Sequence, residues 1–466
     1  MSYFIRDTSG RTSVIADIET YFRNNFVDEL SALVAVRSES EEPSQHGELV
    51  HYLDHLIVPL LRNCGFSTSV ETTSAGHPIL FADRIEDPSY ETILLYGHGD
   101  VCAPQAGLWR DGLEPFVLTL DGDRMYGRGT ADNKAQHLIN LRALSTVIAR
   151  RPRIGFNVKV LIEMSEEIGS PGLREYCHDN ADRLSADVLI ASDGPRLRAD
   201  VPTLFMGSRA AINFELRVHL RDSAYHSGNF GGLLADPALI LAHAISSITN
   251  ERGAIAVPEW RPDSFSETLR QSIAKLPLSA DGPPIDYDWG EESLNPLERA
   301  FGWNSFAILS MLSGLPESPQ NAIAGHAVAV CQLRYVVGTD HTDILPALRR
   351  HLDRNGFEAV SIKPMYESTV AATRLRSDHP WVTFVAHSIH ATGGLEPDLL
   401  PNLAGTIPND AFVEILNLPT IWIPHSYAGC CQHAPNEHVL ASVMLDALRN
   451  MTGLFWDIGE RGNQTE

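Results

Sequence analysis

The chain has 466 residues, of which 44% are hydrophobic, and its formal net charge is −23 at pH 7. This length exceeds one ordinary hydrophobic core and predicts about two to three domains. The negative charge argues against a nucleic-acid partner, because phosphates would be repelled unless a local basic stripe overrode the field. The short basic patch at 149–153 is interpreted instead as cations at the end of a helix.

The six cysteines have no regular spacing, and Cys430 and Cys431 are adjacent, so they predict neither a disulfide framework nor a zinc finger. We therefore expect reduced thiols. The first residues lack the basic stretch and apolar core of an export signal, and no apolar run approaches the length of a membrane span. These features predict a cytoplasmic protein with no membrane partner.

The first two hundred residues predict helices that alternate with short strands. Apolar residues three and four apart indicate helices at 13–36, 45–63 and 132–148. Short β-branched and apolar runs indicate strands at 78–81, 92–96, 157–162 and 187–190. Such alternation predicts an α/β fold around a mostly parallel sheet, with ligands on loops at the carboxyl edge of the sheet.

The pattern changes after Gly207, because residues 211–220 alternate apolar and polar side chains as a half-exposed strand does. A further strand and two helices follow, at 327–337, 239–249 and 342–355. We expect an inserted α+β domain at 208–370, between two parts of the first domain at 1–207 and 371–466. The last part carries a predicted helix and strand, at 381–392 and 419–423.

Acids and histidines gather in five short segments, each where a predicted strand ends or a helix begins. These segments lie at 96–100, 127–134, 163–169, 192–194 and 432–438. No segment suffices alone, since a His-x-Asp triplet or a Glu-Glu pair occurs by chance in many proteins. Open α/β sheets collect their ligands at such positions, so we expect the five segments to meet.

Two adjacent divalent cations need a carboxylate that bridges them, together with nitrogen and oxygen ligands on each side. Asp132 is the expected bridge. His98 and Asp193 are expected to complete one site, and Glu167 and His433 the other. Sites of this composition accept zinc, manganese and cobalt, and zinc is the default expectation.

Two further acids stand beside the expected ligands. Asp100 follows His98 by two residues and is expected to accept the second N–H of the imidazole, which would fix its tautomer. Glu166 precedes Glu167 and is expected to act as the general base, which receives a proton from water and passes it to the leaving nitrogen.

From about residue 20 to the C-terminal region, the chain resembles the M20 family of co-catalytic metallopeptidases, especially the dipeptidase branch with the carnosine dipeptidases. The resemblance implies the ligand and base roles just given. It also implies a catalytic domain interrupted by a lid that mediates dimerisation, and hence a homodimer. The implied reaction is hydrolysis of the peptide bond of dipeptides or short peptides by a metal-bridging hydroxide.

The resemblance extends to three segments that would contact the substrate. Residues 225–232 are similar to a His-Ser-Gly-x-x-Gly-Gly segment, which implies that His226 stabilises the oxyanion of the substrate bound by the other subunit. Arg334 lies in a segment similar to one whose arginine binds the substrate carboxylate. Gly405 and Thr406 resemble a Gly-Ser-Ile-Pro loop at the carboxyl end of the substrate.

Other interpretations stay open. His98 alone also suits a hydrogen-bonded interior histidine, and Arg334 also suits a surface ion pair. Departures from the family pattern at Ala135, Ala324 and Ala404 remove no ligand but leave the shape of the pocket open. The alternative functions are an N-acyl-amino-acid deacylase or related amidohydrolase and, from another class, a metal-bearing binding protein without catalysis.

Overall fold

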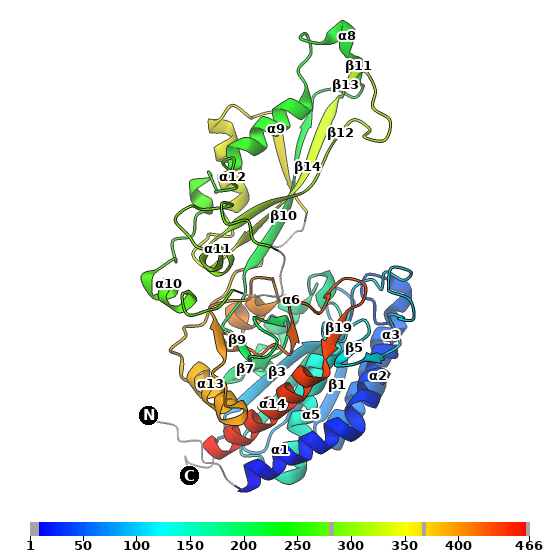
Figure 1. The fold of residues 1–466 in the computed structure, drawn as a ribbon, viewed down its shortest axis with the longest axis vertical. Helices are drawn as coiled ribbons and strands as arrows, with labels where there is room; N and C mark the ends of the chain where they lie inside the picture. Colours follow the sequence, from blue (N-terminus) through cyan, green and yellow to red (C-terminus); the bar gives the residue numbers. More distant parts are fainter. Residues whose placement is uncertain (1–8, 279–283, 366–369, 463–466) are drawn as a thin grey trace.

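The computed structural model describes residues 9–278, 284–365 and 370–462, and these residues form two sheet-containing bodies (Figure 1). The larger body carries an eight-stranded sheet, and the smaller body a four-stranded sheet. The outer ends of the predicted first and last segments, 1–8 and 463–466, lie outside the described residues.

The larger sheet is mixed, with the strand order β1-β2-β6-β3-β7-β17-β9-β16. Parallel pairing joins β6, β3, β7 and β17, whereas β1, β2 and β6 pair antiparallel. The strands are β1 (Ser67–Thr72), β2 (Pro78–Arg84), β3 (Thr92–His98), β6 (Asn157–Glu163), β7 (Val188–Ala191), β9 (Thr203–Phe205), β16 (Asp398–Leu400) and β17 (Thr420–Trp422). The predicted α/β class is therefore confirmed.

The central strands read as continuous apolar runs because both of their faces are covered. In β3, Ile93 and Leu95 pack into one core, whereas Leu94 and Tyr96 pack into the core on the opposite face. All these side chains are buried. The helices on both faces thus require apolar residues at 93–96, and a polar ligand candidate, His98, stands at the carboxyl end of the strand.

One helical layer unites the two ends of the chain. Helix α14 contacts α1, α5 and α13, and the four lie in front of the sheet in Figure 1. The helices of the larger body are α1 (Ser9–Tyr21), η1 (Phe22–Phe26), α2 (Val27–Ala35), η2 (Pro43–Gln45), α3 (His46–His51), η3 (Tyr52–Ile57), α4 (Val58–Asn63), α5 (Lys134–Arg150), η4 (Glu166–Ile168), α6 (Leu173–Asp179), α7 (Ala181–Leu184), α13 (Pro380–Gly393), η6 (Ala411–Ile415) and α14 (Ala441–Gly462). Helix α14 is not among the helices that the sequence analysis predicts.

Two small sheets complete the larger body beside its main sheet. They are β4 (Thr119–Asp121), β5 (Arg124–Tyr126) and β19 (His438–Leu440) in one sheet, and β8 (Pro195–Arg196) and β18 (Ser426–Tyr427) in another. Since β19 pairs with β5, the C-terminal part of the chain returns to the first part. The segment that carries His433 lies directly before β19.

The smaller body is an α+β unit whose sheet has the order β12-β14-β10-β15. Its central strands, β10 and β14, alternate buried and more exposed residues, and the buried face packs against α9 and α12. Its elements are β10 (Ala210–His219), β11 (Tyr225–His226), α8 (Ser227–Phe230), α9 (Pro237–Ile248), η5 (Pro258–Trp260), α10 (Glu267–Ile273), α11 (Pro296–Gly302), β12 (Ser305–Ser313), β13 (Ala322–Ile323), β14 (His326–Tyr335), α12 (Ile344–Arg354) and β15 (Val360–Pro364). Edge strand β12 is not among the predicted strands.

The chain passes between the two bodies at two adjacent backbone segments. The N–H of Thr373 donates to the carbonyl of Ser208, and the N–H of Leu375 donates to the carbonyl of Met206. A Cβ atom on Gly207 would lie only 2.1 Å from the carbonyl oxygen of Thr373, so the close contact requires glycine. The domain bounds at 208 and 370 stay a prediction, although the crossings lie beside them.

Among the described residues, no helix is both long enough and apolar enough to cross a membrane. The cytoplasmic location stays a prediction.

Candidate metal centre

The predicted ligand segments meet at the carboxyl edge of the central parallel strands. His98 ends β3 and pairs in register with Glu163 at the end of β6, while Asp193 follows β7 by two residues. Ligand atoms of His98, Asp132 and Asp193 all lie within 4.8 Å of one another. The structure therefore brings together residues that are up to 95 positions apart in this group.

Asp132 lies between two imidazoles. Its Oδ1 is 2.9 Å from Nε2 of His98, and its Oδ2 is 2.9 Å from Nε2 of His433. Each imidazole also faces a second acid, because Nε2 of His98 is 3.5 Å from Asp193 and Nε2 of His433 is 3.0 Å from Glu167. One carboxylate thus links two groups of donors, as a bridge between two cations would.

Asp100 orients both the first imidazole and the glutamate pair. Its Oδ1 is 3.3 Å from Nδ1 of His98, on the side of the ring that faces away from Asp132. The same carboxylate accepts hydrogen bonds from the backbone N–H groups of Glu166, at 3.2 Å, and Glu167, at 3.1 Å. The sequence predicts the contact of Asp100 with the imidazole but not its contacts with the two glutamates.

Glu166 lies at the partly open margin of the cluster. Its side chain is 16% exposed, whereas that of His98 is fully buried, and its Oε2 is 4.0 Å from Nε2 of His98. Burial raises the pKa of the Glu166 carboxyl well above its usual value, and the charges of Asp193 and Asp132 raise it further against the attraction of His98. A carboxyl group whose pKa is raised in this way is suited to proton transfer.

The cluster has an excess of acids over groups that balance their charge. Burial raises the pKa of Glu167 to about 7, and the charge of Asp132 adds to the shift. Hydrogen bonds to Asp132 and Glu167 raise the pKa of His433 to about 11. The shift of His433 shows that the acids around it stabilise positive charge.

Two divalent cations fit this set of donors. Oε1 of Glu167 is buried without a hydrogen-bond partner among the described residues, so it presents a free acceptor to the cluster. If all ionise, the carboxylates of Asp100, Asp132, Glu166, Glu167 and Asp193 carry five negative charges, which two divalent cations nearly neutralise. The carboxylate and imidazole donors are those that zinc, manganese and cobalt accept.

Glu437 holds the turn that presents Asp132. Its Oε1 accepts hydrogen bonds from the backbone N–H groups of Gly129, Ala131 and Asp132, at 3.0, 2.8 and 3.2 Å. Its Oε2 accepts from Nη1 of Arg128 at 2.6 Å, and both side chains are buried. Because Glu437 belongs to the segment of His433, it ties the two sides of the cluster together.

The expected substrate residues Arg334 and Thr406 are in contact across the two bodies. Nη1 of Arg334 donates to Oγ1 of Thr406 at 3.2 Å, and Gly405 precedes the threonine. The same loop passes close to the residue after Asp193, because a Cβ atom on Gly194 would lie 3.2 Å from the Leu403 side chain. The structure thus brings Arg334 together with Thr406, on a loop whose Leu403 lies near Gly194.

Arg209 is a second cation at this place that the sequence analysis does not identify. It is 9% exposed, and its Nε donates to the carbonyl of Ala404 at 2.7 Å. Burial lowers the pKa of Arg209 to about 10, and the charge of Arg334 lowers it further. Local sequence does not indicate that Arg209 lies near Arg334, because their proximity depends on the pairing of β10 with β14, in which Ala211 lies opposite Arg334.

His226 is not part of the cluster within one chain. It lies in β11, at the end of the smaller body that points away from the larger one (Figure 1). The ring is exposed, and its Nδ1 accepts a hydrogen bond from the N–H of Gly228 at 3.1 Å. This contact leaves the proton of a neutral ring on Nε2, which can donate to another molecule.

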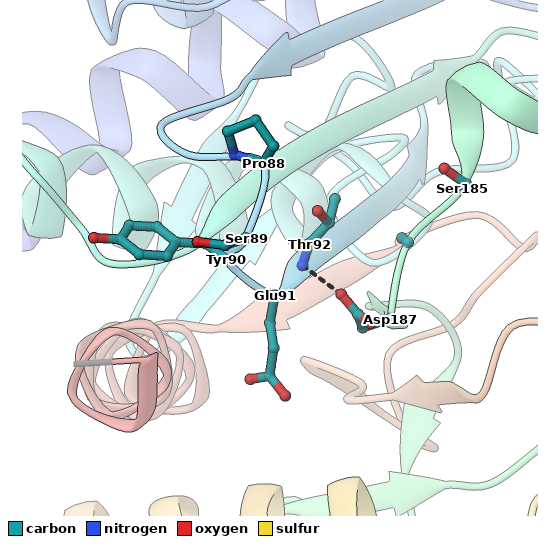
Figure 2. A pocket seen from close by; sticks show the side chains of 8 residues that line it. Pro88, Ser89, Tyr90, Glu91, Thr92, Ser185 and Asp187 are labelled. Carbon is teal, nitrogen blue, oxygen red and sulfur yellow. Dashed lines mark hydrogen bonds between the residues drawn. The ribbon is translucent and has the colours of Figure 1, made fainter. Parts of the chain in front are cut away.

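A hollow of about 350 Å³ lies elsewhere, at the amino ends of β3 and β7 (Figure 2). It is lined by polar residues that include Glu91 and Asp187, and Asp187 accepts a hydrogen bond from the N–H of Thr92 at 2.7 Å. The donor cluster lies at the opposite, carboxyl ends of these strands. The hollow is therefore separate from the candidate metal centre.

Paired acid and imidazole donors at the edge of an α/β sheet are typical of hydrolases that use two divalent cations. A family model described as Peptidase family M20/M25/M40 matches residues 94–457. Because the match spans well over half of the sequence, the chain belongs to this family and is an enzyme of the peptidase class. The predicted resemblance is confirmed.

Known relatives agree with this membership. The Beta-Ala-His dipeptidase of Homo sapiens is 28% identical over 385 residues, which cover 78% of this chain and 74% of the relative. The crystal structure of human carnosine dipeptidase 1 matches with a TM-score of 0.79 at 23% identity, over 97% of this chain and 99% of that chain. The dipeptidase Dug1p of Saccharomyces cerevisiae matches with a TM-score of 0.80 at 20% identity, over 97% and 99% of the two chains. The two structures show the shared fold.

Replacing the central carboxylate should release metal. We expect Asp132→Ala to lose bound cations, because it removes the oxygen atoms that face both imidazoles. Elemental analysis after reconstitution and desalting measures the metal content. Asp121→Ala is the matched control, since Asp121 is 59% exposed and pairs with Arg110 on the surface. Full metal content in Asp132→Ala would contradict the bridging role.

Proposed function

We propose that the protein is a two-metal dipeptidase, which hydrolyses the peptide bond of dipeptides or short peptides. The observation that carries this proposal is the Asp132 carboxylate, whose two oxygen atoms each lie 2.9 Å from a different imidazole, His98 on one side and His433 on the other. Membership of a peptidase family supports it and favours catalysis over the alternative of a metal-bearing binding protein.

The proposed ligand set divides into two groups that share one residue. His98, Asp132 and Asp193 would hold one cation, and Asp132, Glu167 and His433 the other. When bound, two divalent cations would polarise a peptide carbonyl and make nearby water more acidic, which would supply the hydroxide of the proposed reaction. Zinc is the proposed metal, with manganese and cobalt as alternatives.

Glu166 is the proposed general base. It would accept a proton from the attacking water and deliver it to the nitrogen that leaves, which requires a carboxyl group that changes protonation during turnover. Its partly exposed position and raised pKa support this role. Asp100 would keep the proton of His98 on Nδ1, so that Nε2 stays free as a ligand atom.

The substrate carboxylate would bind at the junction of the two bodies. Arg334 offers a guanidinium fork there, and Thr406 and the backbone at Gly405 offer further hydrogen bonds. Arg209 adds positive charge beside Arg334, which a bound carboxylate would balance. An N-acyl amino acid carries the same carboxylate, so deacylation remains the second candidate reaction.

A homodimer would bring His226 to the site of the other subunit. Edge strand β12 supports pairing with a second copy, since an open strand edge with exposed apolar side chains favours association. Four large side chains of this strand are 45% to 52% exposed: Ile308, Leu309, Met311 and Leu312. His226 would then donate through Nε2 to the oxyanion that forms in the transition state.

A substrate panel tests the proposed reaction. Metal-reconstituted protein should release free amino acids from dipeptides, and turnover confined to N-acyl amino acids would favour the deacylase instead. Glu166→Ala should retain its metals and lose about a hundred- to ten-thousand-fold in kcat, because the proton shuttle is gone. Glu175→Ala, at an exposed glutamate of α6, is the control. Full activity of Glu166→Ala would exclude its role as base.

Carboxylate recognition by Arg334 has a distinct kinetic signature. Arg334→Ala should raise KM for free dipeptides about 10- to 100-fold, because a hydrogen bond between charged groups is lost. The same substitution should leave KM for C-terminally amidated dipeptides unchanged. Arg217→Ala is the matched control, as Arg217 is a half-exposed arginine of β10 paired with Glu215. An equal rise in KM for both substrates would refute carboxylate binding.

Subunit mixing tests whether His226 acts on the neighbouring subunit. His226→Ala and Glu166→Ala homodimers should each be nearly inactive, whereas a hybrid dimer regains one site with both groups intact. After complete random exchange of equal amounts, activity should approach about a quarter of the wild-type value. Native mass spectrometry verifies the exchange. Hybrid dimers without any recovered activity would argue that His226 acts within its own chain.

A further inference from the structure

A thiol faces the His433 side of the candidate metal centre. Sγ of Cys102, a carboxylate oxygen of Glu167 and a ring nitrogen of His433 all lie within 4.8 Å of one another. Cys102 follows Asp100 by two residues and is partly exposed. The corresponding group on the other side, formed by His98, Asp132 and Asp193, contains only nitrogen and oxygen donors.

The backbone around Cys102 is anchored toward His433. On one side, the N–H of the preceding residue donates to the carbonyl of Ser38 at 2.9 Å. On the other side, Nη2 of Arg128 donates to the carbonyl of the following residue at 3.0 Å. The side chain of Gln105 then donates to the carbonyl of His433 at 3.0 Å. These contacts fix the backbone on both sides of Cys102, and the last of them ties its loop to His433.

Glu167 supplies independent evidence that this group binds a cation. Its side chain is 2% exposed, and Oε2 lies 3.0 Å from Nε2 of His433. Its Oε1 has no hydrogen-bond partner among the described residues. A buried carboxylate oxygen without a donor is costly, and a cation at this place would remove that cost.

We propose that Cys102, through Sγ, is a ligand of the cation held by Asp132, Glu167 and His433. This inference rests on the two-metal centre of the proposed function. Zinc–sulfur and zinc–nitrogen bonds of about 2.3 and 2.1 Å separate the two donors by at most about 4.4 Å, and by less in a tetrahedral site. The three donors, which lie within 4.8 Å of one another, can therefore share one cation if the side chains rotate toward it.

Coordination changes the protonation of Cys102 but involves no electron transfer. The S–H bond breaks as the sulfur–metal bond forms, and the proton passes to solvent. A sulfur donor makes the two cation positions chemically different, because thiolate selects zinc and cobalt over the harder manganese. The cation site that includes Cys102 should therefore retain zinc when the other cation site accepts manganese.

Cobalt spectroscopy tests the sulfur ligand directly. Full-length protein reconstituted with cobalt(II) should show a near-ultraviolet charge-transfer band from sulfur to cobalt. The band should disappear in Cys102→Ser and remain in Cys64→Ser, a matched control because Cys64 is also a partly exposed free thiol. The affinity of Cys102→Ser for zinc, measured with a competing chelator, should fall about 10- to 100-fold.

Alkylation of the wild-type protein provides a second test that needs no variant to fold. Zinc should protect Cys102 from iodoacetamide, as measured by peptide mass spectrometry, while the exposed Cys431 reacts equally with and without zinc. A charge-transfer band that persists in Cys102→Ser, or equal labelling of Cys102 with and without zinc, would overturn the proposal.

The outcomes separate this inference from the proposed function. Hydrolysis of dipeptides by a cobalt protein that lacks the sulfur band would keep the dipeptidase and remove Cys102 as a ligand. A sulfur band without any hydrolysis would keep the ligand and remove the dipeptidase.

Discussion

The contact on which the molecule depends is the one between the Asp132 carboxylate and the two imidazoles of His98 and His433. A buried acid of this kind is stable only where its charge is balanced and its position fixed. Glu437 fixes the position, through hydrogen bonds to the turn that carries Asp132. Asp100 does the same for His98 and for the glutamate pair. In this centre, two acids, Glu437 and Asp100, thus hold the residues that are expected to bind the cations.

The sheet supplies the geometry that this network needs. Because β3, β6 and β7 are parallel, their carboxyl ends meet at one edge, and the polar segments that follow them converge. Those strands stay in register because both of their faces are buried. Loops alone would not hold carboxyl groups so close together against their mutual repulsion. The apolar layers therefore stabilise a site to which they contribute no ligand.

Local sequence predicted the fold class and the convergence of five segments, since strand ends and apolar periodicity are visible in a short window. It did not predict contacts that only tertiary structure creates. Arg209 meets Arg334 through strand pairing, and Cys102 meets His433 through a loop held by Arg128. Strand β12 escaped prediction because its exposed apolar face matches no pattern of burial. His226 lies far from the cluster within one chain, so its predicted role still depends on a second copy.

The bond between Arg334 and Thr406 joins residues of different bodies, which the backbone connects at two neighbouring segments. A ligand bound there would link the two bodies, because it would contact the smaller body and the larger body at the same time. The free energy of binding its charged end would then also favour one angle between the bodies over others. Selectivity for one end of the ligand and the relative arrangement of the two bodies would therefore depend on the same conformational equilibrium.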